Sequence, residues 1–368
     1  MLRPVALLLL LLSPLHALAV ETMRIAMGDS QGQVRVSGKR LSFASDSEDA
    51  RFSPLDQDSA VVRRRGSRLE LNGAPVMGTA VRFRAGVDAR DAGVPGSSPL
   101  RAGDMQVRGD VVVRLYKDGL QLINVIPLED YLAAVLGSEM PVSFPPEALK
   151  AQAVAARTYA LQKKLETYGS PFHMGSSVLH QVYGGVNRED PRSLAAVEAT
   201  RGEVLTYELA PIEAYFHASC GGRTESGQDA LQRNLPYLQA VDCPCGSLPA
   251  SRWSATVSDA ELQAALGQST EGFHVTSRTA TERVNRVATA GGLSLDGAAL
   301  RRKLGYTKLK SLEFDVERSG GTWHFNGRGY GHGAGFCQWG AKALADEGLT
   351  YRDILLHYYP GTELQQLY

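Results

Sequence analysis

The sequence lacks the features that would point to a nucleic-acid-binding or membrane-spanning protein. Its 39 lysines and arginines equal its 39 aspartates and glutamates, so no excess of positive charge favours nucleic acid. After the first 19 residues, no segment is long and apolar enough for a membrane span. There is no internal repeat, and the hydrophobic content of 43% is that of a globular core rather than a disordered chain.

The strongly apolar stretch at the N-terminus has the pattern of a secretory signal peptide, residues 1–19. Arg3 supplies the positive charge, residues 7–12 are all leucine, and residues 17–19 fit the small-x-small cleavage pattern. The run is too short for a membrane span, and no cysteine follows the cleavage site to carry a lipid. We therefore expect an exported protein, periplasmic or extracellular, with no transmembrane anchor after cleavage.

Cysteine is scarce, with four residues in the chain: Cys220, Cys243, Cys245 and Cys337. In an oxidising compartment this number suggests one disulfide, from Cys220 to Cys243 or Cys245, because Cys243 and Cys245 are too close to favour each other. His217 with Cys220, Cys243 and Cys245 would also be a permissible tetrahedral zinc set. We favour the disulfide and expect no cofactor. A Cys–His nucleophilic pair is a third option, but no orienting acid is evident.

The alternation of residue types predicts a β-rich region over residues 20–110. Four segments alternate apolar and polar residues, which is typical of strands: 23–27, 33–36, 68–71 and 80–84. Residues 88–103, rich in Gly, Ala, Pro and Ser, indicate a loop or linker. A hairpin should follow, with strands at 106–115 and 119–126.

The next segment predicts an amphipathic helix that ends at an acid. Leu128, Leu132 and Val135 recur at steps of four and three, and four residues further the same stripe reaches Glu139. Met140 then stops the helix, because a residue before proline disfavours helical geometry.

A second, alanine-rich helix is predicted to begin at Pro145 and Pro146 and to continue to Lys164. Further strands are expected at 204–207, 214–217 and 316–325, and further helices at 258–266, 295–304, 338–347 and 351–358. This mixture predicts an α+β fold.

Glu139 has the chemistry of a general acid. At the edge of an apolar face, desolvation would raise the pKa of its carboxyl toward the working range of an acid catalyst. Lys150 and Arg157 lie two turns apart on the following helix and so share a face, which could orient the acid or bind substrate oxygens. The alternative is a surface carboxylate at a helix end beside two solvated basic residues.

Two further segments carry polar side chains suited to a sugar. Gln181 and Tyr183 point to one face of a strand or extended loop, although a hairpin with a buried tyrosine explains them equally. The glycine-rich stretch 327–340 is not a phosphate loop, since no Gly-Lys-Ser/Thr closes it. It should present His332 and then enter a helix near Gln338, unless it is only a tightly packed hairpin.

Taken together, these segments resemble the SpoIID/LytB domain family. The matching motifs lie at 127–131, 138–141, 149–159, 181–183, 219–222, 329–333, 338–341 and 358–361. The match spans residues 111–368, which the resemblance implies to be one SpoIID-like domain with mixed helices and strands around a cleft, preceded by the β-rich region.

The resemblance implies a function on the cell wall. The family includes lytic transglycosylases that cleave MurNAc–GlcNAc linkages of denuded peptidoglycan strands, and it places the catalytic acid on Glu139. The residues that it implies for the cleft or its support are Lys150, Arg157, Gln181, Tyr183, His217, Ser219, His332 and Gln338. Other members enhance cell-wall amidases, so an amidase-activating module is the alternative, with an amidase as partner. A zinc hydrolase is a third hypothesis.

Overall fold

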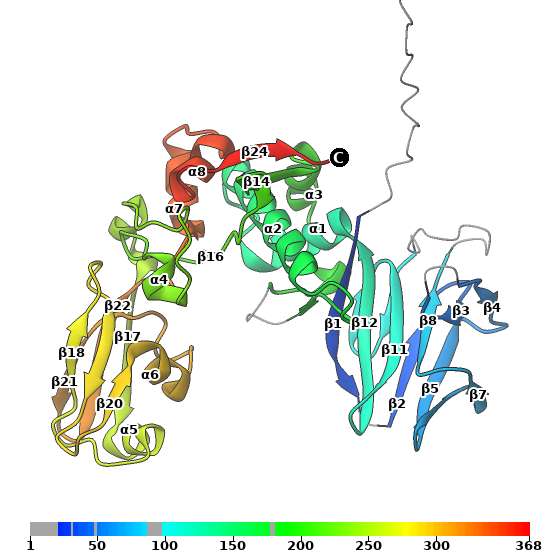
Figure 1. Ribbon diagram of the computed structural model, residues 1–368, viewed down its shortest axis with the longest axis horizontal. Helices are drawn as coiled ribbons and strands as arrows, with labels where there is room; N and C mark the ends of the chain where they lie inside the picture. The colour runs from blue at the N-terminus through cyan, green and yellow to red at the C-terminus, as the bar shows by residue number, and fades with distance from the viewer. Residues whose placement is uncertain (1–20, 31, 48–49, 87–97, 177–180) are drawn as a thin grey trace, which may run out of the picture.

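The computed structural model describes residues 21–30, 32–47, 50–86, 98–176 and 181–368. The predicted signal peptide, residues 1–19, lies outside them. Figure 1 shows the N-terminal sheets at one end, a group of helices in the middle and a smaller part with strands and two helices at the other end. This mixture of helices and sheets confirms the predicted α+β class.

Two sheets form the N-terminal part. The first has the order β13-β1-β12-β11-β8-β3-β4 and the second the order β10-β9-β2-β5-β6-β7. Their buried faces contribute to one hydrophobic core, as the alternation of buried and exposed residues along the strands predicts. The bounds in the first sheet are β1 Thr22–Ser30, β3 Ser42–Ser45, β4 Ser53–Pro54, β8 Ala80–Arg84, β11 Asp110–Tyr116, β12 Gly119–Pro127 and β13 Met174–Gly175. Those in the second are β2 Gln33–Ser37, β5 Ser59–Arg65, β6 Arg68–Leu71, β7 Ala74–Val76, β9 Leu100–Ala102 and β10 Met105–Val107.

The four strands predicted from alternation are all present, and two details differ. The hairpin of β11 and β12 begins at Asp110, because residues 105–107 pair with β9 in the second sheet. Residues 100–102, expected in a loop, are β9 itself. Short segments of this kind are decided by the partner strand rather than by their own pattern. β11 also pairs with β8, so strands from both sides of residue 110 share the first sheet.

Helix α2 (Pro146–Glu166) is the centre of the helical group. It packs against α1 (Leu128–Glu139), α3 (Pro191–Ala199), α7 (Gln338–Asp346) and α8 (Tyr351–Tyr358). Its residues from 151 to 161 are all buried, and five of them are alanines, whose small side chains let neighbouring helices approach closely. A three-stranded sheet lies at the edge of the group: β14 Glu203–Tyr207, β15 Ala210–Pro211 and β24 Glu363–Gln366.

Helix α1 begins and ends as its sequence predicts. Glu129 and Asp130 occupy the first turn, where negative charge is favourable next to the helix dipole. Leu132 and Val135 are fully buried. Met140 has an extended backbone, with φ −128° and ψ 147°, as expected before a proline. Glu139 is thereby the last helical residue.

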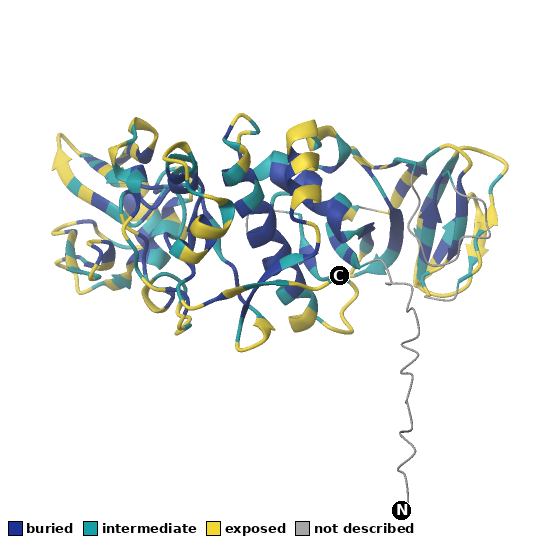
Figure 2. Cartoon of the chain, turned by 90° about the horizontal axis from the view of Figure 1, so that it is seen from above, coloured by how far each residue is buried: buried dark blue, intermediate teal, exposed yellow. Residues whose placement is uncertain are grey.

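Residues 252–328 form a unit that we call the insertion module. It has its own hydrophobic core, which includes Trp253, Val257, Leu300, Phe314 and Phe325, and Figure 2 shows its buried residues in dark blue. The elements are β17 Arg252–Ser258, α5 Asp259–Leu266, β18 His274–Arg278, β19 Val284–Ala288, β20 Ser294–Asp296, α6 Gly297–Leu304, β21 Glu313–Ser319 and β22 Thr322–Arg328.

The two helices predicted in the insertion module are present, but the single strand predicted at 316–325 is wrong. It is the hairpin of β21 and β22, because Gly320 and Gly321, both with positive φ, turn the chain in the middle of this segment.

Short elements link the module to the helices: β16 Phe216–His217, α4 Gly227–Leu231, η2 Pro244–Ser247, η3 Pro249–Ser251 and β23 Phe336–Cys337. A further short helix, η1 Gly185–Arg188, lies against α1 and β10. The strand expected at 214–217 is thus reduced to its last two residues. In the described part of the chain, no helix has the length and apolar character needed to cross a membrane.

Candidate active site

The carboxylate of Glu139 lies half-buried at the end of α1. Its Oε1 accepts a hydrogen bond from the peptide nitrogen of Val182 at 2.6 Å. Burial raises the pKa of Glu139 above its usual value, and hydrogen bonds from the Val182 N–H and the Gln338 side chain partly offset that rise. The carboxyl group therefore holds its proton to higher pH than an exposed glutamate does.

Two glutamine side chains from separate helices meet beside this carboxylate. Gln338, the first residue of α7, is 5% exposed and donates from Nε2 to Oε1 of Gln152 at 3.2 Å. Gln152 is fully buried in α2, and its own Nε2 has no hydrogen-bond partner among the described residues. Buried donors of this kind call for an explanation.

Lys150 lies on the solvent side of α2, where its Nζ donates to Glu147 Oε1 at 2.7 Å. It lines a largely apolar groove of about 600 Å³ between α2, α3 and α7, together with Phe144, Leu149 and Lys342. A ligand can reach Lys150 from this groove, so its substrate-binding role stays a prediction.

Arg157 is fully buried and is not a cleft residue, which corrects the expectation that it binds substrate. Its guanidinium forms two hydrogen bonds with Glu129, at 2.9 and 2.7 Å, and others with the backbone oxygens of Glu203 and Val197. The spacing correctly predicted a shared helix face with Lys150. However, the part of α2 that contains Arg157 lies in the interior of the protein, where residues of α3 and β14 cover the arginine.

Gln181 and Tyr183 are also buried, which corrects their assignment as sugar contacts. The tyrosine is buried as in the alternative, but residues 181–184 form no hairpin. Gln181 accepts from the Tyr131 hydroxyl at 2.9 Å and donates to the Ala156 carbonyl at 3.1 Å. Tyr183 donates to Asn124 Oδ1 at 2.8 Å. These bonds fix the backbone on either side of residue 182, so the two side chains position the N–H that binds the carboxylate of Glu139.

His217 and His332 face each other with ring centroids 5.3 Å apart. His332 lies between backbone groups, with Nε2 2.9 Å from the Phe216 carbonyl and Nδ1 accepting from the Ala334 N–H. Burial lowers the pKa of His332 to about 4 and that of His217 well below its usual value, so both rings are neutral at neutral pH. Gly331 is required here, since a Cβ would lie 2.6 Å from that of His217.

One ring nitrogen of His217 has no hydrogen-bond partner among the described residues. Its Nδ1 is 3.1 Å from the Ala334 carbonyl, while Nε2 is buried without a partner in the described part of the chain. No hydrogen bond or ion pair joins either histidine to Glu139 among the described residues. The substrate-binding role of His217 and His332 therefore stays a prediction.

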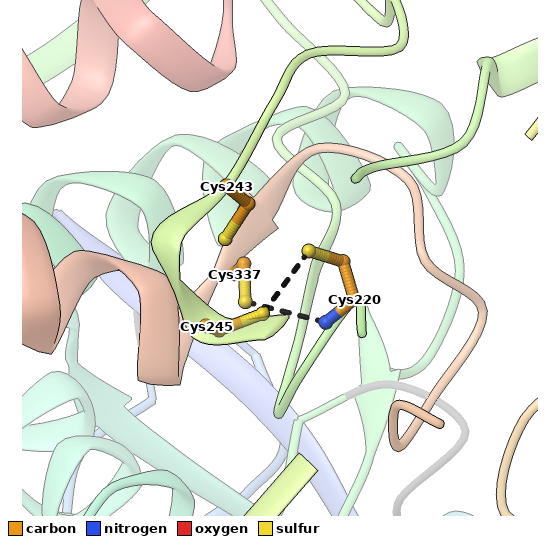
Figure 3. A group of neighbouring side chains, drawn as sticks. All are labelled: Cys220, Cys243, Cys245 and Cys337. Atoms are coloured by element: carbon orange, nitrogen blue, oxygen red, sulfur yellow. Dashed lines mark hydrogen bonds between the residues drawn. The ribbon is translucent and has the colours of Figure 1, made fainter. Parts of the chain in front are cut away.

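Ser219 lies among the cysteines and is not exposed to a cleft, which corrects its predicted role as a substrate contact. Its Oγ is 2.7 Å from Ser251 Oγ and 3.5 Å from Cys245 Sγ, and the residue is 1% exposed. The neighbouring cysteines are shown in Figure 3.

The cysteines differ from both sequence-based expectations. All four are free thiols, so the predicted disulfide is absent; the sulfurs of Cys220 and Cys245 are 3.3 Å apart, whereas a disulfide needs about 2.05 Å. The fourth member of the group is Cys337 rather than His217. Strand β16 pairs with β23 in parallel, and this long-range pairing brings Cys337 to the others.

Comparison with known proteins assigns the chain to a family. Over 277 residues the chain is 36% identical to the stage II sporulation protein D of Bacillus amyloliquefaciens, and the match covers 70% of this chain and 79% of that protein. The chain belongs to the stage II sporulation protein D family. The SpoIID family model, described as "Stage II sporulation protein", matches residues 116–207, a range that contains α1, α2 and Glu139.

Two further relatives extend the SpoIID likeness. The stage II sporulation protein D of Bacillus subtilis is 34% identical over 301 residues, covering 77% of this chain and 87% of that protein. A protein named amidase enhancer, also from Bacillus subtilis, is 32% identical over 291 residues, which is 63% of this chain and 40% of that protein.

Sequence reasoning missed three parts of this SpoIID site: Gln152, the N–H of Val182, and Cys337 as a neighbour of the other cysteines. The available signal for Gln152 was a lone polar residue between Ala151 and Ala153 in an alanine-rich helix. A backbone N–H leaves no signal in the sequence.

Proposed function

We propose that this chain is a peptidoglycan lytic transglycosylase in which Glu139 is the catalytic acid. Its substrate is the MurNAc–GlcNAc linkage of glycan strands stripped of stem peptides, and its product carries a 1,6-anhydroMurNAc end. The observation that supports this most strongly is the half-buried carboxyl of Glu139, whose pKa is raised by burial while the group still reaches solvent.

The reaction needs one carboxyl group in two protonation states. Protonated Glu139 donates its proton to the glycosidic oxygen, and the bond from C1 of MurNAc to that oxygen breaks. The resulting carboxylate then takes the proton of the C6 hydroxyl of MurNAc, whose oxygen attacks C1 of the same sugar. Since the nucleophile is intramolecular, no second carboxylate is required, unlike in most glycoside hydrolases.

The surroundings of Glu139 suit both states. Burial favours the protonated form before the reaction, and the Val182 N–H and the Gln338 side chain stabilise the carboxylate after proton donation. Lys150, which lines the groove between α2, α3 and α7, is a donor for the strand.

The place of action follows from the substrate. We propose that the protein is exported by its N-terminal segment and acts in the periplasm or at the cell wall, with glycan strands as its partner and cell-wall remodelling in sporulation or division as its process. Two relatives named stage II sporulation protein D support this assignment.

The test is a digest of denuded glycan strands with product analysis by mass spectrometry. Wild-type protein should release anhydro-sugar products, and Glu139→Gln should lower their rate by about 10²- to 10⁴-fold, the usual contribution of a general acid. Glu347→Gln is the matched control, because Glu347 also lies at a helix end but is exposed, and it should leave the rate unchanged. Equal rates for wild type and Glu139→Gln would exclude Glu139 as the acid.

A second candidate function is activation of a cell-wall amidase. It is favoured by the 32% identity to the amidase enhancer of Bacillus subtilis. In that case denuded strands give no anhydro ends, with wild type or variant, while addition of the protein speeds peptide release by a separate amidase. Glu139→Gln should leave this stimulation intact.

A further inference from the structure

Four thiol groups from separate parts of the chain meet in one small, buried space. Cys220 follows β16, Cys243 and Cys245 flank Pro244 at η2, and Cys337 is the last residue before α7. All four sulfurs lie within 4.8 Å of one another, and none of the residues is more than 8% exposed. Figure 3 shows the side chains pointing toward a common centre.

The distances fit a tetrahedral metal site. A zinc ion with Zn–S bonds of 2.3 Å sets neighbouring sulfurs about 3.8 Å apart. The 3.3 Å between the Cys220 and Cys245 sulfurs and the upper limit of 4.8 Å for the group lie on either side of that value. Each sulfur is therefore within a short movement of a regular S₄ arrangement.

Hydrogen-bond donors surround the sulfurs as they do in metal–thiolate sites. The peptide nitrogens of Cys220 and Gly340 both donate to Cys337 Sγ at 3.3 Å. Ser219 Oγ donates to Cys245 Sγ at 3.5 Å, and the hydroxyl of Tyr358 is 3.2 Å from Cys243 Sγ. Hydrogen bonds of this kind to the ligand atoms orient the ligands and stabilise their charge.

The sulfurs are packed so closely against Gly340 that no larger residue fits at this position. A Cβ at Gly340 would lie 2.3 Å from Cys243 Sγ and 2.1 Å from the hydroxyl of Tyr358. The glycine therefore lets the first turn of α7 approach the cluster closely enough for its N–H to reach a sulfur.

We propose that Cys220, Cys243, Cys245 and Cys337 bind one zinc ion in a structural S₄ site. Four protein sulfurs fill the tetrahedral positions, so no position is left for water or substrate, and the ion has no catalytic role. Binding displaces the thiol protons to solvent, and the ion neutralises part of the charge that they leave. This geometry argues against a zinc hydrolase.

The site has a structural consequence for the cleft. Cys337 immediately precedes Gln338, the side chain that acts on Glu139, and Cys220 lies three residues after His217. Zinc would therefore tie the first residue of α7 to the segment after β16. It would also close the base of the insertion module, because Cys245 precedes the module and Cys337 follows it.

The first experiment measures zinc in the full-length protein purified from the periplasm of an expression host. Elemental analysis should give about one zinc ion per chain, and Cys337→Ser should lower it at least tenfold. His217→Gln is the matched control, since His217 is a buried neighbour of the cluster but not a ligand in this proposal, and it should keep its zinc. Full zinc in Cys337→Ser, or loss of zinc in His217→Gln, overturns the ligand set.

A second measurement uses wild type alone, because a serine variant can fail to fold. Replacement of zinc by cobalt should give the intense visible bands of a tetrahedral Co²⁺–thiolate site, and alkylation should reach the cysteines only after a chelator is added. A protein without metal that resists alkylation after unfolding until it is reduced contains disulfides instead. An iron–sulfur spectrum likewise overturns the proposal for zinc.

Discussion

The Oε1 atom of Glu139 lies 2.6 Å from the peptide nitrogen of Val182, across 43 residues of sequence. This hydrogen bond fixes one oxygen of the carboxyl group. Because backbone N–H groups cannot be removed by side-chain substitution, the contact depends on the fold of the segment. Gln181 and Tyr183 hold that segment from both sides.

The stability of Glu139→Gln should depend on pH. The raised pKa of Glu139 means that the native state binds this proton more tightly than the unfolded state. The contribution of Glu139 to stability is therefore fully present below its unfolded pKa and is lost as pH rises through the folded pKa. At pH 7 the variant should be as stable as wild type or more stable, with its relative advantage shrinking toward pH 4. Chemical denaturation at the two pH values measures this; a variant that is clearly less stable at pH 7 contradicts it.

Gln338→Ala should move the pH profile of the glycan digest. Removing a hydrogen bond that favours the carboxylate raises the pKa of Glu139 further, so the decline of kcat/KM on the alkaline side should shift to higher pH. The rate at low pH should fall as well, because the carboxylate formed by proton donation is less stable. Gln263→Ala, at an exposed position of α5, serves as the control with an unshifted profile. An unshifted profile in Gln338→Ala would mean that Gln338 does not act on Glu139.

Arg157→Ala should destabilise the fold, whereas Lys150→Ala should not. Loss of Arg157 leaves Glu129 half-paired in the interior, which costs about 3–5 kcal/mol. The pair of Lys150 and Glu147 is partly exposed and contributes less than about 1 kcal/mol. Urea unfolding compares the two variants. If Lys150→Ala leaves stability intact but raises KM for glycan strands, the groove beside Lys150 carries substrate.

Arg283→Ala should loosen the contact between the insertion module and the cysteine cluster. The guanidinium of Arg283, 3% exposed, donates to the backbone oxygens of Cys220 and Arg223 at 2.6 and 2.9 Å. Calorimetry of the variant should show the module and the helical group unfolding in separate steps. Arg286→Ala, an exposed arginine of β19 in the same module, should unfold as wild type does. One cooperative transition in Arg283→Ala would show that other contacts couple the two parts.

Local sequence patterns predicted most helices and strands well, but they predicted poorly which side chains contact one another in the fold. The end of α1 at Glu139 follows from spacing within one turn and from the proline after Met140, so the sequence sufficed. The burial of Arg157 depends on neighbours from α3 and β14, and the place of Cys337 depends on a pairing 120 residues distant in the chain. Contacts between residues so far apart in the chain leave no periodic pattern in the sequence. The structure was therefore needed to correct the predicted substrate-binding residues and to identify the four clustered cysteines.

The two ends of the insertion module are neighbours in space, since Arg252 at the start of β17 pairs with Arg328 at the end of β22. The chain therefore leaves the helical group and returns to it at almost the same point. Such an arrangement makes residues 252–328 a separable cassette: a gene could lose it, lengthen it or exchange it without rerouting the remaining chain. The module can thus diversify in evolution while the carboxyl group of Glu139 keeps its surroundings.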